Sequence, residues 1–515
     1  MLMPHKNPLK PPVLAQNSDL LHQIGAISVF VDQKVSLFVL ISEAPILHIH
    51  TSQIPCYENN QAMTETLILK NARVIATMDD NEREIENGYI EVRDNKIESV
   101  GSMDECPDTA DRIIDLSGHV VIPGLINTHH HMFQSLTRAL PAAQNGELFD
   151  WLSALFPVWR NITPAMQRAA SRTAMAELML SGCTTAADHA YLHVNGITLD
   201  DSVQAATEMG IRFHGARGAM SLGQSKGGLP PDELVELDEH AILRDMQRVV
   251  ETHHDHSPDA MIRVALAPCS PFTVTTDLMR EAATMARSMK VGLHTHTAEN
   301  WKDLAFSKER YGMTPTEFTE DVGWVGDDVW HAHCVHLDDP GIALFARTGT
   351  GVAHCPCSNM RLASGIAPVR KMLDSGVKVG LGVDGSASND TGNLMDEARL
   401  AMLSARVRDQ NPGAMTAREA LRVATRGGAE VLGRGDALGR IQPGYCADIV
   451  AFRTDDIAMA GGQSDPLASL VFCTPPRVSW SIINGRVVIE EGNLLTHSLP
   501  HIVEEQNLMA RQLID

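Results

Sequence analysis

Residues 120–131 read VVIPGLINTHHH, an apolar run that ends in three consecutive histidines. The apolar part predicts a buried β-strand with the histidines at its exit. Because successive side chains of a strand point to opposite faces, His129 and His131 project to one side and His130 to the other. Two imidazoles on one side of a strand end are suited to binding a metal ion. For three adjacent histidines alone, a polar strand end or loop is the alternative interpretation.

Three further short apolar runs end in residues that bind metals or move protons. These residues are His296 and Glu299 in VGLHTHTAE (291–299), His333 in WHAHC (330–334) and Asp384 in VKVGLGVDG (377–385). Imidazole and carboxylate groups suit zinc or iron, and a catalytic site of this kind keeps one position open for water. None of the motifs has the paired cysteines of a structural zinc site.

Strand and helix patterns alternate over about 300 residues. Short strands are expected at 120–128, 183–188, 211–216, 261–267, 291–296, 329–334, 351–355 and 378–384, with helical stretches such as 163–181 and 277–289 between them. This alternation predicts an α/β fold, a (β/α)₈ TIM-like barrel, because no GxGxxG of a doubly wound fold follows the first strand. The carboxyl ends of barrel strands build the active site, so the motifs after strands one, five, six and eight are expected to converge.

The two flanks of the barrel pattern predict a second, smaller domain. Apolar and polar residues alternate from 67 to 122 with turn signals between them, and a similar pattern recurs at 448–452 and 478–488. These runs are typical of short antiparallel strands. We therefore expect a β-sandwich from residues 63–122 and 436–500, a barrel from 123–435, and a C-terminal tail at 501–515.

Residues 1–62 lie outside these patterns. Two apolar runs, 27–31 and 35–41, are too short to span a membrane, and the charges of Asp32 and Lys34 between them break a secretory signal. The segment that starts MTETLILKNARV at Met63 reads as a natural beginning. We interpret the first 62 residues as an over-extended translation or a tail, with organelle targeting as the alternative.

The composition is that of a catalytic protein with a large core. The chain has 515 residues, 44% of them hydrophobic, and a formal net charge of −22, which disfavours wrapping by nucleic acid. Nine cysteines are too few for a disulfide framework at this length, so a reducing cytoplasm is the expected location. We interpret Cys355 and Cys357 as packing residues.

Taken in order, the motifs resemble the amidohydrolase superfamily, in the cytosine deaminase-like branch that also holds guanine deaminases and s-triazine hydrolases. The resemblance covers about residues 63–496. Its markers are PGLINTHHH (123–131), HTAE (296–299), AHC (332–334), Ser358-Asn359 with Leu362 and Gly365, VDG (383–385) and GYCAD (444–448). Within the branch, residues 129–152, 223–232 and 267–272 most resemble the 8-oxoguanine deaminases.

Motifs and resemblance together imply one metal ion per chain, Zn²⁺ with Fe²⁺ as the alternative. The expected ligands are His129, His131, His296 and Asp384. Water on such an ion has a pKa lowered toward about 7. One ion rather than two is expected because the fourth strand, 261–267, lacks the lysine that bridges the metals of binuclear relatives. The spare imidazoles His130, His294 and His336 are expected to be supporting or core groups.

The resemblance also implies roles in proton transfer. Glu299 would carry a proton from the water to a ring nitrogen and then to the departing amine. A carboxylate that caps a helix is the alternative for Glu299. His333 would polarise the water, and Asp384 would orient it and accept its proton.

The prediction of substrate contacts rests on fewer residues. Gln134 stands where guanine and 8-oxoguanine deaminases use an amide to bind a purine, and an amide matches the adjacent N–H and C=O of an oxopurine. A solvent-facing residue at a helix start is the alternative for Gln134. Trp151 could supply a stacking wall and Arg217 a charge, although such residues are more often structural. In place of the arginine–phenylalanine pair of guanine deaminases, residues 268–272 read PCSPF, which disfavours plain guanine.

These features lead us to expect hydrolytic deamination of 8-oxoguanine to urate and ammonia. Guanine, isocytosine or s-triazine hydrolysis is the alternative within the family, and a non-catalytic scaffold is the alternative outside it. The expected partner is a small oxopurine or related aminoheterocycle, with neither nucleic acid nor membrane. Relatives imply a homodimer.

Overall fold

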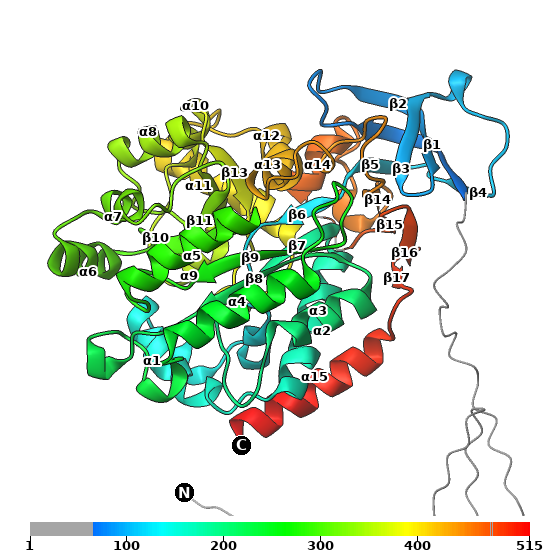
Figure 1. Ribbon diagram of the computed structural model, residues 1–515. Helices are drawn as coiled ribbons and strands as arrows, with labels where there is room; N and C mark the ends of the chain where they lie inside the picture. Colours follow the sequence, from blue (N-terminus) through cyan, green and yellow to red (C-terminus); the bar gives the residue numbers. More distant parts are fainter. Residues whose placement is uncertain (1–64, 474, 476) are drawn as a thin grey trace, which may run out of the picture. The chain divides into compact units, whose positions relative to one another are not determined.

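Eight parallel strands close into a barrel in the order β10-β11-β12-β13-β6-β7-β8-β9. The computed structural model describes residues 65–473, 475 and 477–515 (Figure 1). The barrel strands are β6 (Leu125–Asn127), β7 (Cys183–Ala190), β8 (Arg212–Ala219), β9 (Ile262–Pro268), β10 (Gly292–Thr297), β11 (Val329–His333), β12 (Gly351–His354) and β13 (Lys378–Leu381). Each overlaps one of the eight strands expected from the sequence, so the predicted barrel is confirmed.

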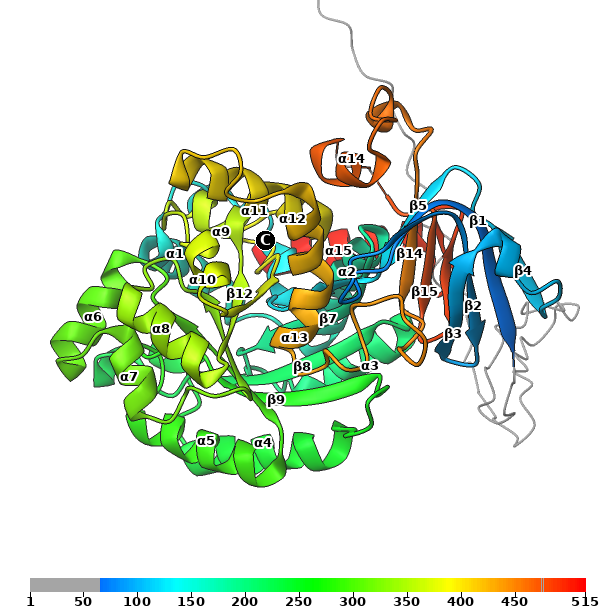
Figure 2. The ribbon, with the colours of Figure 1, turned by 90° about the horizontal axis from the view of Figure 1, so that it is seen from above.

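Helices between the strands cover the barrel (Figure 2). They are α1 (Leu148–Trp159), α2 (Pro164–Leu180), α3 (Leu199–Met209), α4 (Glu239–His253), α5 (Thr276–Met289), α6 (Trp301–Tyr311), α7 (Pro315–Asp321), α8 (Asp339–Thr348), α9 (Pro356–Arg361), α10 (Val369–Asp374), α11 (Leu394–Asp409), α12 (Ala417–Arg422) and α13 (Gly428–Val431). In α5 the hydroxyl of Thr275 caps the N-terminus by accepting the Leu278 N–H at 3.1 Å. Its buried residues Leu278, Ala282 and Ala286 recur every four positions, which directs one apolar face of the helix to the core.

Strands that precede and follow the barrel in the sequence form a second sheet of nine strands (Figure 2). The N-terminal part supplies β1 (Thr66–Ala76), β2 (Glu84–Arg93), β3 (Lys96–Ser102), β4 (Arg112–Asp115) and β5 (His119–Pro123), and the C-terminal part β14 (Ile449–Arg453), β15 (Trp480–Ile483), β16 (Arg486–Glu490) and β17 (Asn493–Leu494). The strands run in order β17-β16-β15-β14-β5-β1-β2-β3, with β4 beside β1. The discontinuous assembly matches the sequence, but β1 pairs parallel with β4 and β5, so the expectation of antiparallel strands alone was wrong.

Gly124 divides the long apolar run that opened the sequence. Residues before it form β5 in the nine-stranded sheet, and residues after it form β6 in the barrel. A Cβ at Gly124 would lie only 2.1 Å from the Thr184 hydroxyl oxygen, so the close approach of β7 requires glycine here. The run therefore passes from sheet to barrel within one residue and delivers the histidines to the carboxyl end of β6.

The chain ends in helix α15 (Leu499–Ile514), which lies along α2 (Figure 1). Arg172 of α2 donates two hydrogen bonds to Glu505 at 2.7 and 2.9 Å, so the segment placed in a C-terminal tail is an ordered helix tied to the barrel. Helix α14 (Pro466–Cys473) precedes β15. Among the described residues, no helix has the length and apolar character needed to cross a membrane. The interpretation of residues 1–62 falls outside the described part of the chain.

Candidate metal and catalytic site

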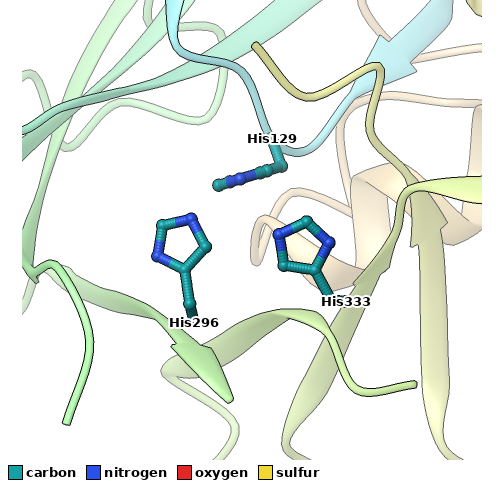
Figure 3. A group of neighbouring side chains, drawn as sticks. All are labelled: His129, His296 and His333. Atoms are coloured by element: carbon teal, nitrogen blue, oxygen red, sulfur yellow. The ribbon is translucent and has the colours of Figure 1, made fainter. Parts of the chain in front are cut away.

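Five side chains from four strand ends meet at the carboxyl end of the barrel. His129 and His131 follow β6, His296 lies in β10, His333 ends β11, and Asp384 follows β13. His129, His296 and His333 point toward a common centre (Figure 3), and their ligand atoms lie within 4.8 Å of one another. An Asp384 oxygen, Oδ1, lies 3.3 Å from His129 Nε2 and 3.4 Å from His131 Nε2. The four histidines and Asp384 are all buried.

Each of these imidazoles is held through Nδ1, which leaves Nε2 toward the centre. The Nδ1 contacts are His131 to the His189 carbonyl at 2.8 Å, His296 to the Cys269 carbonyl at 2.6 Å, His333 to Asn359 Oδ1 at 2.9 Å and His129 to His294 Nε2 at 2.7 Å. An Nδ1–H that donates to a carbonyl leaves Nε2 as a lone pair, so we assign this tautomer to His131 and His296. Their two Nε2 atoms then face each other at 3.2 Å. Lone pairs at this separation repel unless a cation lies between them.

His129 supplies an independent test of whether a metal fits. Its Nε2 is buried and has no hydrogen-bond partner. A buried nitrogen without a partner is costly, and a metal ion would satisfy it. Three imidazole nitrogens and one carboxylate around this point form a donor set typical of zinc or iron.

His294 orients His129 from behind. Its Nδ1–H donates to the Trp330 carbonyl at 2.9 Å, its ring stacks on the Trp330 indole at 4.6 Å, and its Nε2 accepts from His129. Burial holds the pKa of His294 well below its usual value, which keeps the ring neutral and able to accept. Neither His130 nor His336 belongs to a ligand group among the described residues; His336 instead contacts the Ser364 carbonyl at 2.9 Å.

Asp384 is fixed by its backbone and by two serines. Its φ of +63° turns the chain sharply at the end of β13. Ser358 and Ser388 donate hydrogen bonds to its Oδ2 at 2.5 and 3.0 Å, which leaves Oδ1 toward the histidines. Burial opposes ionisation, but the neighbouring His129 and His333 outweigh it and hold the pKa of Asp384 well below its usual value. The carboxylate is therefore ionised and ready to bind a cation.

Glu299 lies beside this centre rather than capping a helix. The cap of α6 is Asn300, whose side chain accepts the Asp303 N–H at 2.9 Å. Glu299 instead donates its own N–H to Asp303 Oδ2 at 3.1 Å and places Oε2 3.6 Å from His333 Nε2. Burial raises the pKa of Glu299 to about 7. A carboxyl with this pKa can both take up and release a proton near neutral pH.

A cavity with about 490 Å³ of empty space opens onto His131, His296, Glu299, His333 and Asp384. Its apolar wall consists of Leu148, Trp151, Leu152, Phe156, Met220, Phe272 and Leu362. Its other polar groups are Gln134, Tyr191, Cys269, Ser270, Thr273 and Ser388. A mostly apolar cavity with a few polar groups beside a metal-binding centre is typical of a small-molecule site.

Gln134 reaches the cavity from a short 3₁₀ segment, Met132–Thr137. It is only 1% exposed, which excludes the solvent-facing alternative. Its Nε2 donates to the Tyr191 hydroxyl at 3.2 Å, while its Oε1 is buried without a partner. The amide packs against Gly385, where a Cβ would lie 1.9 Å from Oε1. Glycine after Asp384 therefore makes room for the amide.

Of the two other residues expected to contact the substrate, Trp151 lines the cavity and Arg217 does not. Trp151 lines the cavity and donates its indole N–H to the Ala387 carbonyl at 3.0 Å, so it forms a fixed wall. Arg217 does not line the cavity: its guanidinium is buried against Glu236, with two bonds of 2.8 Å, and against Asp245 at 2.9 Å. These contacts make Arg217 part of a structural ion-pair network. We therefore do not propose Arg217 as a substrate contact.

Sequence reasoning did not find Tyr191 or the pairing of His294 with His129. Tyr191 follows β7, the second barrel strand, from which the sequence predicted no ligand. Its ring meets the ring of His131 edge-on at 4.8 Å, so it connects the His131 imidazole with Gln134. A tyrosine after a strand has no distinctive spacing, and only the closed barrel brings it to the site.

Comparison with known proteins agrees with this architecture. The family model described as "Amidohydrolase family" matches residues 120–488. The chain is 41% identical over 430 residues to the 8-oxoguanine deaminase of Pseudomonas aeruginosa, covering 83% of this chain and 95% of that protein. It is 36% identical to the hydroxydechloroatrazine ethylaminohydrolase of Pseudomonas sp. strain ADP, covering 74% and 80%. The zinc-complexed atrazine chlorohydrolase of Arthrobacter aurescens TC1 superposes with a TM-score of 0.82 at 36% identity, covering 86% and 100%. The chain is a hydrolase that belongs to the amidohydrolase family.

Proposed function

We propose that this protein hydrolyses the exocyclic amine of 8-oxoguanine, yielding urate and ammonia. The observation that carries the proposal is the buried Gln134 amide, which lines the same cavity as Glu299 and keeps Oε1 without a partner. An unpaired buried carbonyl favours a ligand with an N–H in that position. The 41% identity to a P. aeruginosa 8-oxoguanine deaminase supports the same substrate.

We propose one zinc ion as the cofactor. The residues that would hold it are His129, His131, His296 and Asp384. When bound, zinc lowers the pKa of water to about 7 and so supplies a nucleophile at neutral pH. The absence of lysine from β9 supports one ion rather than two, and the zinc-complexed structural relative supports zinc as the metal.

Proton transfer falls to Glu299, assisted by His333 and Asp384. Glu299, with a pKa of about 7, is placed to take a proton from the attacking water and deliver protons to a ring nitrogen and to the departing amine. Burial opposes protonation of His333, but the carboxylates of Glu299 and Asp384 outweigh it and raise its pKa. A protonated His333 donates a hydrogen bond from Nε2 to the water. Asp384 accepts the second proton of the water and passes it through Glu299 to the departing amine.

The cavity walls fit a flat bicyclic ring. Trp151, Phe156 and Phe272 offer apolar surfaces to the ring, and the Gln134 amide would form hydrogen bonds with one polar edge of the ring. Burial raises the pKa of Cys269 to about 12, so this position, which follows β9, presents a neutral thiol rather than a charge. A neutral group here suits an oxidised purine better than it suits plain guanine, whose deaminases resemble one another in carrying arginine.

An s-triazine substrate is the second candidate, because triazine hydrolases superpose on this chain with TM-scores of 0.83. Release of ammonia or chloride from 8-oxoguanine, guanine, isocytosine and hydroxylated or chlorinated s-triazines separates the candidates. We expect kcat/KM for 8-oxoguanine to exceed the others by at least about tenfold, because a matched polar pair contributes roughly 1–3 kcal/mol. A larger value for a triazine would overturn the oxopurine assignment.

A further inference from the structure

Three arginines gather at the amino ends of β8 and β9, at the opposite end of these strands from the metal-binding centre. Arg212 begins β8, Arg263 is the second residue of β9, and Arg434 follows α13. All three donate to one short segment, 257–260. The bonds run from Arg263 to the Ser257 carbonyl at 3.0 Å, from Arg434 to the Pro258 and Ala260 carbonyls at 2.8 and 2.9 Å, and from Arg212 to the Asp259 and Ala260 carbonyls at 2.6 and 2.8 Å.

His214 joins these arginines from the neighbouring strand. It stands directly opposite Arg263 in the β8–β9 register, and it shares a face of β8 with Arg212. It is 3% exposed. We call Arg212, His214, Arg263 and Arg434 the basal cluster.

The positive charge of the basal cluster is only partly balanced. Asp448 binds Arg212 through both oxygens at 3.0 Å. Within the described part of the chain, no carboxylate lies within 4.0 Å of Arg263 or Arg434, since neither forms an ion pair. The nearby Asp259 is engaged elsewhere, with its carboxylate accepting from Asn95 at 2.7 Å.

Several buried donors of the basal cluster lack partners. Arg434 is 2% exposed, yet its Nε and Nη1 have none, and the same holds for Arg263 Nε. The ring of His214 also has a buried nitrogen, Nε2, without a partner. Burial and the charges of Arg212 and Arg263 lower the pKa of Arg434 to about 9, so its guanidinium still carries its charge at neutral pH. A buried unpaired cation is costly, and water would satisfy the donors without balancing the charge.

We propose that the basal cluster binds a small inorganic anion, chloride being the simplest, between Arg434, Arg263 and His214. The anion would accept from the unpartnered guanidinium donors, and from His214 in the tautomer that carries hydrogen on Nε2. It would also balance the positive charge of Arg263 and Arg434, neither of which forms an ion pair among the described residues. It would also hold together segment 257–260 and the start of the barrel strands. Arg212 links this unit to Asp448, which directly precedes β14 of the nine-stranded sheet. The site is thus structural and remote from the reaction.

Two measurements on the full-length, metal-loaded protein test the site. Crystals soaked in sodium bromide should show an anomalous peak within hydrogen-bond distance of Arg434 Nε. In solution, chloride should raise Tm by about 2 °C over gluconate at equal ionic strength, with saturation, because binding to the folded state alone stabilises it.

Variants make the test specific. Arg434→Met should abolish the chloride effect, whereas Arg244→Met should keep it, because Arg244 is 70% exposed and pairs with surface Asp238. Should Arg434→Met fail to fold, the half-buried Arg263→Met serves instead and should weaken chloride dependence severalfold. Equal Tm values in chloride and gluconate would overturn the proposal, and a bromide peak without any chloride effect in solution would mean an adventitious ion only.

Discussion

Substitution of Gly385 by alanine tests how the substrate cavity is built. The added Cβ would lie 1.9 Å from Gln134 Oε1 and 2.2 Å from its Cδ, far inside van der Waals contact. The φ of Gly385 is not in the left-handed region, so alanine adds no backbone strain. The Gly385 N–H that donates to Asp384 Oδ1 at 2.7 Å is retained. The only direct consequence is therefore displacement of the Gln134 amide.

The size of the effect follows from the bonds that Gln134 loses. Displacement breaks the 3.2 Å hydrogen bond to Tyr191 and removes Oε1 from the substrate edge. Leaving a buried polar group unmatched costs roughly 1–3 kcal/mol, and 1.4 kcal/mol is a factor of about ten. We expect kcat/KM for 8-oxoguanine to fall about ten- to hundredfold in Gly385→Ala, with metal content unchanged.

A double-mutant cycle gives the decisive comparison. Gln134→Ala should lower kcat/KM by a similar factor. Because Gln134→Ala also removes the atoms that clash, the double variant should be no worse than Gln134→Ala alone. Full activity in Gly385→Ala, or losses that simply add in the double variant, would refute the role of Gln134. Loss of metal from Gly385→Ala would instead locate the damage at Asp384.

Other predictions concern proton transfer and the groups that hold the ligands. Glu299→Gln should reduce kcat by about 10²–10⁴-fold with the metal retained, because the amide has the same shape but carries no proton; near wild-type turnover would exclude Glu299 as the proton carrier. Since Glu299 must be ionised to accept a proton and its pKa is about 7, kcat/KM of the wild type should rise with pH through about 7 and fall again at higher pH, where His333 loses its proton; the rise should be absent from the residual activity of Glu299→Gln. His294→Phe should weaken metal affinity about 10–100-fold, because His129 loses the acceptor for its Nδ1–H, whereas His336→Ala should leave affinity unchanged; equal affinities in competition with a chelator would show that His294 does not orient His129. Tyr191→Phe should raise KM for 8-oxoguanine more than it lowers kcat, because it frees the Gln134 amide without altering the metal donors.

Much of the fold could be predicted because its strongest signals are local. Each barrel strand is a short apolar run, and period-two geometry placed His129 and His131 on one side of the chain. The common direction of parallel strands then implied that motifs far apart in sequence would meet. The structure brings His129, His131, His296, His333 and Asp384 together with Glu299 as expected.

Other features depend on contacts that no local pattern encodes. Residues 120–128 divide between two sheets at Gly124, where Thr184 approaches closely, and β1 pairs in parallel with β5 although three strands lie between them in the sequence. Arg217 stands at a strand exit like the functional residues, but Glu236 and Asp245, 19 and 28 residues away, neutralise it. The hydrogen bonds that link Trp330 to His294 and His294 to His129 also form only in the closed barrel.

Metal stoichiometry tests the central claim most directly, namely that one ion lies among these imidazoles and Asp384. Elemental analysis should be made on protein produced with ample zinc and then freed of loosely bound metal, with activity measured on the same sample. We predict about one zinc per chain at full activity, because His129, His131, His296 and Asp384 converge on one point and β9 lacks a bridging lysine. Two equivalents at full activity, or full activity without metal, would contradict the claim.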